Sequence, residues 1–261
     1  MVNPPKTKPA PGAGEPLRAP KAITFQPGIY DCVLDVMPTD KRVRILDAGA
    51  GEGFFARKLS DAGYQNVQAT DYVADGFLCP DIPFTQANLA ESLPFPDDHF
   101  DCVVSVEVIE HLENHFAFVA ELVRVTKPGG QIVITTPNVM SISSRWHFFV
   151  FGYSDCAPLP LQPHRDDWFM QHVNPIGVPM LLFHFDRNGA DMVDLRTNRM
   201  RSGSRLMAPL MRPLMRWCLK KKLVRDKYTE RRELFDEHMR WVLSDANLLG
   251  RITIAIAEKR S

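Results

Sequence analysis

The sequence has no long uninterrupted apolar run and few cysteines, and both shortages exclude classes of protein. No window of about eighteen residues is apolar and uncharged, so no membrane-spanning helix is predicted. The five cysteines are widely spaced without a C-x-x-C pair, so neither a disulfide framework nor a thiolate zinc site is expected. We therefore expect a cytoplasmic protein.

The formal net charge is zero, because 31 basic residues balance 31 acidic ones. Overall charge therefore favours neither nucleic acid nor membrane as a partner. The balance is uneven along the chain: thirteen Lys or Arg and only two acids lie between Arg196 and Arg232. One segment of the chain carries a concentrated positive charge.

An apolar signal-peptide segment is also absent from the N-terminus, whose first twenty residues include six prolines. We expect residues 1–24 to form a disordered, proline-rich tail and residues 25–261 to form one domain.

Within that domain, strand and helix patterns alternate, which predicts an α/β fold with a mostly parallel sheet and helices on both faces. Seven strands are expected, at residues 43–47, 66–71, 84–87, 102–106, 131–136, 192–196 and 251–257. Helices are expected at 27–37, 53–62, 112–126 and about 174–188. The last two strands are expected to form a hairpin-like pair at the sheet edge.

The segment "VRILDAGAGEGFFARKL" holds the strongest motif. An apolar strand ends at Asp47, and Gly49, Gly51 and Gly53 lead into a helix. Glycines allow a sharp turn and a close approach of backbone to ligand, and a helix N-terminus offers free N–H groups. The third glycine falls one position too early for the G-x-G-x-x-G dinucleotide motif, which disfavours a nicotinamide or flavin cofactor.

This loop resembles motif I of the class I S-adenosylmethionine-dependent methyltransferases. The segments "QATDYV", "ANLAESLPFPDDHFDCVVS" and "ELVRVTKPGGQIVITTPN" follow in the order of that family. The resemblance implies a Rossmann-like, seven-stranded fold and S-adenosylmethionine as cofactor.

Residue roles follow from the resemblance. The three glycines would pass close to the methionine part of the cofactor, and Asp47 would face its ammonium group. Asp71 would accept hydrogen bonds from the ribose hydroxyls. Asn88 would accept a hydrogen bond from the adenine amino group, and Leu89 would contact the adenine ring. Val106 would line the methionine end. Many relatives have Asp where this chain has Asn88.

A polar triplet, Glu107, Glu110 and His111, follows the apolar strand at 102–106. Ligands of open α/β sheets bind outside the carboxyl ends of the strands. If a helix begins near Glu107, all three side chains share one helix face and can converge on a cation. Two carboxylates suit Mg²⁺, which would activate an acceptor hydroxyl.

The triplet resembles the E-x-x-E-H segment of ubiquinone-biosynthesis O-methyltransferases and of small-RNA terminal 2′-O-methyltransferases, where it binds a divalent metal. A further histidine completes the second group's site, and His172 or His164 stands in a comparable loop. Two alternatives remain open: His111 or His172 acts as a metal-free general base, or the triplet is structural.

Residues 199–246 are expected to form a basic helical insertion or lid before the last strand. Within it, the apolar residues of the segment 205–222 recur on one side of a predicted helix and cationic residues lie on the other side. This arrangement is typical of a helix at an anionic membrane surface. Pro209 and Pro213 are expected to kink or divide this helix. The alternatives are a lid packed on the domain and a surface for RNA or an acidic glycan, and the scarcity of aromatics among the basic residues disfavours RNA.

The sequence thus predicts a methyltransferase acting on an oxygen of a small-molecule, lipid-linked or glycan acceptor near the cytoplasmic face of the membrane. Its segment "HVNPIG" and its amphipathic insertion also resemble methyltransferases associated with surface-polysaccharide synthesis. Two alternatives are an RNA 2′-O-methyltransferase and a non-catalytic scaffold that only binds the cofactor.

Overall fold

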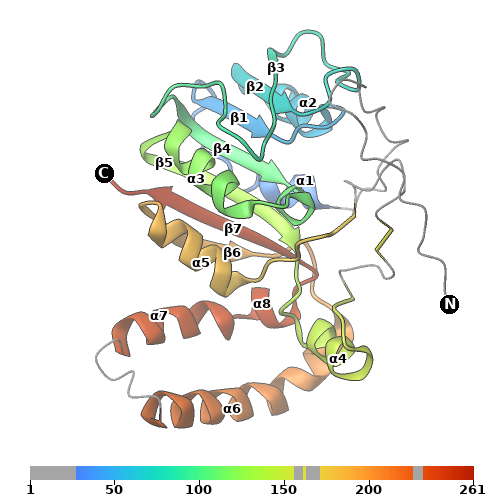
Figure 1. Ribbon diagram of the computed structural model, residues 1–261, viewed down its shortest axis with the longest axis vertical. Helices are drawn as coiled ribbons and strands as arrows, with labels where there is room; N and C mark the ends of the chain where they lie inside the picture. The colour runs from blue at the N-terminus through green and yellow to red at the C-terminus, as the bar shows by residue number, and fades with distance from the viewer. Residues whose placement is uncertain (1–27, 156–160, 163–170, 226–231) are drawn as a thin grey trace, which may run out of the picture.

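The computed structural model describes residues 28–155, 161–162, 171–225 and 232–261. Seven strands form one sheet in the order β3-β2-β1-β4-β5-β7-β6 (Figure 1). Their bounds are β1 Arg44–Ala48, β2 Asn66–Asp71, β3 Phe84–Gln86, β4 Phe100–Val106, β5 Thr126–Pro137, β6 Ala190–Arg196 and β7 Ile252–Lys259. The first five strands pair in parallel, and β7 runs antiparallel to both β5 and β6.

Helices lie on both faces of the sheet and at one end of the molecule (Figure 1). They are α1 Ile29–Leu34, α2 Phe54–Asp61, α3 His115–Val125, α4 Ile142–Phe151, α5 Val178–Arg187, α6 Ser202–Arg225, α7 Arg232–Val242 and α8 Asp245–Leu249, with a short 3₁₀ helix η1 at Ile109–His111. The predicted α/β fold, the seven strands with their mostly parallel pairing and the antiparallel final pair are confirmed, with boundaries shifted by a few residues.

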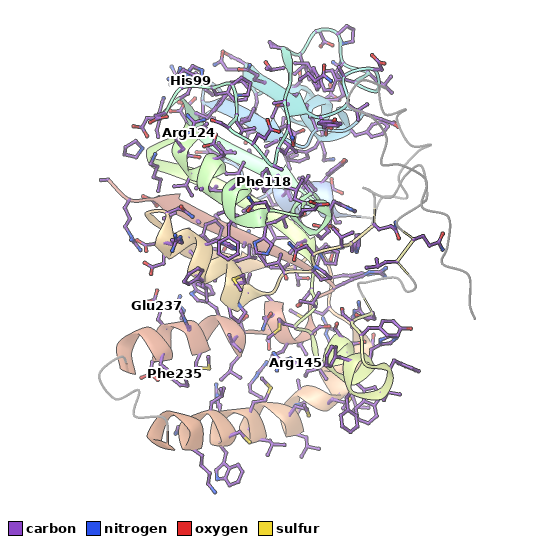
Figure 2. The ribbon with its side chains drawn as sticks, viewed as in Figure 1. His99, Phe118, Arg124, Arg145, Phe235 and Glu237 are labelled. Carbon is purple, nitrogen blue, oxygen red and sulfur yellow. The ribbon has the colours of Figure 1, made fainter. Side chains whose placement is uncertain are left out.

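Alternate residues of the strands divide the core into two halves. Leu46 and Val103 face α3 and α5, and they pack with Phe118 of α3 (Figure 2). Ile45 and Val104 face the opposite way, toward α1 and α2. Strands buried on both faces are typical of a parallel sheet, and each fully buried large side chain contributes about 1.5–3 kcal/mol.

The insertion between β6 and β7 consists of α6, α7 and α8, which lie with α4 at one end of the molecule (Figure 1). It is helical as expected, but Pro209 and Pro213 lie inside one continuous helix α6 instead of dividing it. Tertiary packing of α6 against α4 and α8 offsets the backbone hydrogen bonds that these prolines lose.

The proline-rich tail at 1–24 lies outside the described residues. Among the helices that the structure describes, none has the length and apolarity needed to cross a membrane.

Candidate functional site

The glycine loop connects β1 to α2 and is held by the neighbouring strand β2. The N–H groups of Gly49 and Ala50 donate to the Thr70 carbonyl at 2.8 and 3.1 Å. The Gly51 N–H donates to Asp71 Oδ2 at 2.8 Å. Because β1 and β2 are parallel, Asp47 and Asp71 both lie where their strands end, at the carboxyl edge of the sheet.

Two glycines of the loop are required for different reasons. A Cβ on Gly49 would lie 2.3 Å from Val108 Cγ2, so this glycine allows the loop to pack against the segment after β4. A Cβ on Gly51 would meet no atom of the described residues within 4 Å, so among them the space beside Gly51 is open. Both have positive φ, 88° and 53°. An open space beside a sharp turn is where a ligand can approach the backbone.

We predict that Gly49→Ala destabilises the protein by about 2–4 kcal/mol, the combined cost of a left-handed alanine and an overpacked contact. Gly51→Ala is the matched control, with a cost of about 1–2 kcal/mol because only the backbone term applies. Urea unfolding measures both. The double variant Gly49→Ala/Val108→Ala should recover part of the loss; if it does not, the Val108 contact is not the cause.

Asp47 is buried to 1% exposure, and its Oδ2 atom has no hydrogen-bond partner among the described residues. Burial, and then the charge of Asp71, raises the pKa of Asp47 to about 7. Burial also raises the pKa of Asp71, while the N–H groups of Gly51 and Val73 oppose that rise. An unpaired buried carboxylate oxygen beside the glycine loop is suited to a cationic group of a ligand.

The other three residues expected at the cofactor have distinct surroundings. Asn88 Oδ1 accepts the Ala90 N–H at 3.1 Å, and its Nδ2 donates to Glu91 Oε1 at 2.8 Å, so this side chain stabilises a turn. Leu89 is buried in the core. Val106 is the last residue of β4 and is partly buried.

Glu107 departs from the predicted helix. Its φ is +56°, the left-handed region, and a 3₁₀ helix of only three residues follows at η1. Its N–H donates to Thr135 Oγ1 at 2.9 Å, and that hydroxyl donates to Glu107 Oε1 at 2.8 Å. The expectation of one helix face for Glu107, Glu110 and His111 is therefore wrong, since the helix α3 begins only at His115.

A different triplet converges instead. Glu110, His111 and His172 each offer a ligand atom, and these three atoms lie within 4.8 Å of one another. His172 lies in the segment that follows residue 170. Asn174 holds this segment against η1, because the Asn174 N–H donates to the Glu110 carbonyl at 3.0 Å. Glu107 is not a member of this cluster. His164, the other histidine that was considered, lies outside the described residues.

The hydrogen bonds of the cluster determine which ring nitrogen of His111 carries a hydrogen. His111 Nδ1 lies 3.2 Å from the Gln171 carbonyl oxygen, which can only accept, so Nδ1 carries the hydrogen. In the neutral ring, Nε2 then keeps its lone pair, and this atom lies 3.9 Å from Glu110 Oε1. Both carboxylate oxygens of Glu110 are buried without a hydrogen-bond partner among the described residues.

Burial determines the charge of the cluster. Burial, and then the charge of Glu107, raises the pKa of Glu110 well above its ordinary value. Burial, and then His172, lowers the pKa of His111 to about 4. Although their atoms are within ion-pair distance, Glu110 and His111 are both favoured in their neutral forms.

Tyr30 is a residue of the site that the sequence did not indicate. Burial, and then the charges of Asp47, Glu107 and Glu52, raises its pKa. The phenol of α1 therefore lies near the carboxylates at both the glycine loop and the end of β4. No motif surrounds Tyr30, so only the packing of α1 on the loop could have revealed it.

Comparison with known proteins gives matches centred on this region. Residues 46–134 match the family model described as "Methyltransferase domain". A Mycolicibacterium smegmatis protein named "Probable S-adenosylmethionine-dependent methyltransferase" is 38% identical over 104 residues, 38% of this chain and 40% of the relative. A ubiquinone/menaquinone biosynthesis C-methyltransferase of Pseudomonas putida is 30% identical over 130 residues, 44% of this chain and 50% of the relative. The matches thus span half or less of these relatives.

Solved structures share the fold at low sequence identity. An S-adenosylmethionine-dependent methyltransferase from Archaeoglobus fulgidus aligns with a TM-score of 0.56 at 17% identity, covering 88% of this chain and 93% of that one. One from Mesorhizobium loti aligns with a TM-score of 0.53 at 18% identity, covering 88% and 96%.

Proposed function

We propose that this chain, whose central domain belongs to the class I S-adenosylmethionine-dependent methyltransferases, methylates an oxygen of a small-molecule, lipid-linked or glycan acceptor at the carboxyl edge of its sheet. The observation that carries the acceptor side of the proposal is the convergence of Glu110, His111 and His172. The cluster follows β4, which pairs directly with β1 and so places it beside the glycine loop.

The residues of the loop fit the cofactor. The open space at Gly51 admits a ligand close to the backbone, and the orphaned Oδ2 of Asp47 suits the ammonium group of a methionine. Asp71 ends β2, and its carboxylate, which already accepts the Gly51 N–H, has further lone pairs for ribose hydroxyls. When bound, S-adenosylmethionine supplies an activated methyl group.

The acceptor side needs a group that removes a proton or polarises an oxygen. One carboxylate and two imidazoles can hold a divalent ion, and the Gln171 carbonyl orients His111 as second-shell partners of metal-binding histidines do. This donor set suits Zn²⁺ or Mn²⁺ better than the Mg²⁺ expected for two carboxylates. Glu107, which accepts a hydrogen bond from Thr135, would then line the site instead of binding the ion.

A carbon acceptor is the second candidate, because the Pseudomonas putida relative is named as a C-methyltransferase. Deprotonating a phenol or enol makes its oxygen nucleophilic, and also the ortho carbon of the phenol or the α-carbon of the enol, so the same cluster can serve either reaction. The position of the new methyl group in the product, determined by NMR, distinguishes the two.

A labelling assay tests the proposal. Purified protein is incubated with methyl-labelled S-adenosylmethionine and a cell lysate, with and without a chelator, and label is counted in organic-extractable, water-soluble and RNA fractions. We expect label in the organic or water-soluble fraction, and its loss with chelator and recovery with Zn²⁺ or Mn²⁺. Label in RNA would contradict the proposed acceptor, and cofactor binding without any labelling would contradict the activity.

A further inference from the structure

The second half of α4 exposes an unusual set of large apolar side chains. Phe149 is 80% exposed, and the other members are more than half exposed. They are Trp146, Phe148, Phe149, Val150 and Phe151. The first half of the helix is anchored: Ile142 and Ser144 are buried, and Arg145 reaches from α4 to Met215 Sδ on α6 at 3.6 Å (Figure 2). An anchored helix thus ends in exposed aromatic residues.

Helix α6, which packs against α4, exposes large apolar side chains as well. Leu206 is 85% exposed and Leu210 is 77% exposed, and Leu214 and Trp217 are also exposed. Their spacing of four, four and three residues places all four on one side of the helix. The side of α6 that is covered carries Ala208, Met211 and Met215, which pack with residues of α4 and α8. The exposed ridge is therefore not the face by which α6 joins the domain.

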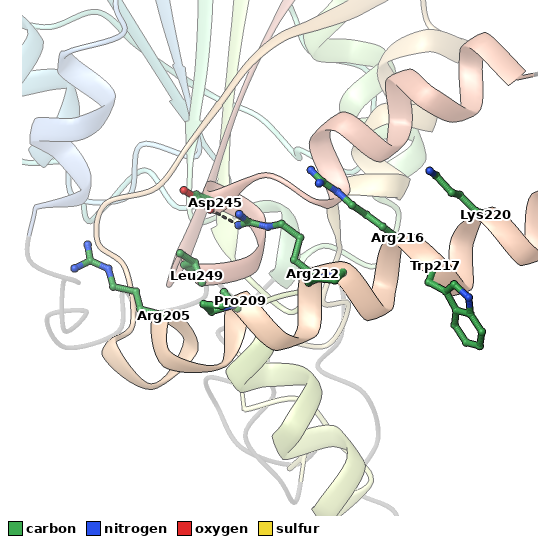
Figure 3. Close-up of a pocket in the computed structure, with 10 residues that line it drawn as sticks. Arg205, Pro209, Arg212, Arg216, Trp217, Lys220, Asp245 and Leu249 are labelled. Carbon is green, nitrogen blue, oxygen red and sulfur yellow. Dashed lines mark hydrogen bonds and ion pairs between the residues drawn. The ribbon is translucent and has the colours of Figure 1, made fainter.

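Positive charge borders the ridge. Arg205, Arg212, Arg216 and Lys220 line a groove of about 690 Å³ between α6 and α8, together with Trp217 (Figure 3). Arg212 is paired with Asp245 across it. Helix α6 contains seven Lys or Arg and no Asp or Glu in its sequence. A cationic groove next to an apolar ridge offers sites for phosphate groups and for acyl chains side by side.

We propose that these exposed residues of α4 and α6, here called the α4–α6 face, dock the protein on an anionic phospholipid bilayer. The aromatic residues of α4 and the leucines of α6 enter the boundary between headgroups and acyl chains, and the groove binds lipid phosphates. The positive charge decides for an anionic bilayer over a second copy of this chain, because two such faces would repel each other.

Helix α4 of the α4–α6 face lies close in sequence to the strand next to β4, so docking would position the candidate site relative to the bilayer. Helix α4 begins five residues after the end of β5, which pairs with β4, the strand that precedes the Glu110–His111–His172 cluster. Docking would hold that edge of the sheet near the bilayer surface. The inference rests on exposure and charge alone, and not on the acceptor proposed above.

Flotation with vesicles tests the face. The full chain should float with vesicles of phosphatidylcholine and phosphatidylglycerol and bind vesicles of phosphatidylcholine alone much more weakly. Phe149→Ser/Leu210→Ser should weaken binding about tenfold or more, because two buried apolar side chains are lost. Arg216→Gln/Lys220→Gln should weaken it about tenfold to thirtyfold, since each charge near an anionic surface contributes about 1 kcal/mol, or roughly fivefold.

Matched controls come from other surfaces. Val193→Ser removes an exposed apolar side chain from β6, and Arg187→Gln/Arg196→Gln removes two charges from α5 and β6. Both should float like the unchanged protein. All variants should bind S-adenosylmethionine normally in calorimetry, which shows that they fold and separates this test from that of the methyltransferase activity.

Results of two kinds would overturn the inference, the first concerning flotation and the second self-association. One is flotation that Phe149→Ser/Leu210→Ser leaves unchanged, or no flotation with anionic vesicles at all. The other is a lipid-free dimer in analytical ultracentrifugation that the same variant converts to monomer, because the face would then join two copies of the chain.

Discussion

Asp47→Asn is expected to stabilise the ligand-free protein at pH 8 and to weaken its binding of S-adenosylmethionine. Burial and Asp71 raise the pKa of Asp47 from 3.8 to about 7. Above pH 7 the folded protein therefore holds an unfavourable buried charge, which Asn removes at nearly constant shape. We expect a gain of about 2–4 kcal/mol at pH 8, or a rise in Tm of roughly 5–12 °C.

The pH dependence identifies the group. Between about pH 4 and pH 7 the folded state keeps a proton on Asp47 that the unfolded chain has released, so its contribution to the free energy of unfolding falls as pH rises through this window. Below pH 4 both states are protonated, and the variant should gain nothing. Thermal unfolding across this range measures the effect. Asp61→Asn, at an exposed aspartate of α2, is the control.

Binding should change in the opposite direction. The ammonium group of the cofactor would lose its carboxylate partner in a buried site, which costs about 2 kcal/mol or more, or at least about 30-fold in Kd. In the unchanged protein, binding should tighten as pH rises toward 7, because the carboxylate must release its proton to pair with the ammonium. A variant that is more stable but binds normally would show that Asp47 does not face the cofactor.

How far the sequence could predict this molecule depended on the range of the interactions involved. The strands and the glycine loop follow from local patterns: an apolar run ends at Asp47, and positive φ at Gly49, Gly51 and Gly53 is what glycine permits. The family resemblance then placed Asp71 at the end of β2, as the structure has it.

The cluster required contacts that no local pattern contains. Glu107 is not a member of the cluster, because its backbone adopts a left-handed conformation after β4. His172 is a member, because the nearby Asn174 hydrogen-bonds to the region of η1, more than sixty residues away in the sequence. On α6, periodicity separates an apolar from a cationic side, but it cannot tell which apolar residues α4 and α8 cover. Met215 of that stripe is covered and Leu210 is exposed.

Glu110→Gln is expected to weaken metal binding at least about 100-fold and to reduce methyl transfer by about 10³-fold without destabilising the fold. Its carboxyl group is buried to 1% exposure, and both oxygens lack hydrogen-bond partners among the described residues. A carboxylate with no structural partner can be replaced by an amide of the same shape at little cost in stability. In the proposed site, a metal ion would lose its only anionic ligand in the cluster, and the proposed activation of the acceptor would be lost with it.

Three measurements on the same variant separate function from structure. Calorimetric titration with Zn²⁺, Mn²⁺ and Mg²⁺ should show a site in the unchanged protein that is weakened at least about 100-fold by Glu110→Gln and by His172→Ala. Glu113→Gln, at an exposed carboxylate three residues further on, should keep the site and the activity. The loss of activity should fall on kcat, with the Kd for S-adenosylmethionine unchanged.

Each alternative for the cluster has its own outcome. If the unchanged protein binds no ion and His111→Ala alone removes activity, His111 acts as a metal-free base, whose loss should cost about 10²–10⁴-fold. If Glu110→Gln lowers the free energy of unfolding and leaves kcat intact, the cluster is structural. Because His111 Nε2 is the ring atom that faces Glu110 and keeps its lone pair, ion binding and base catalysis would use the same atom. Substitution of His111 alone therefore cannot distinguish them, whereas the metal titration and the chelator arm of the labelling assay can.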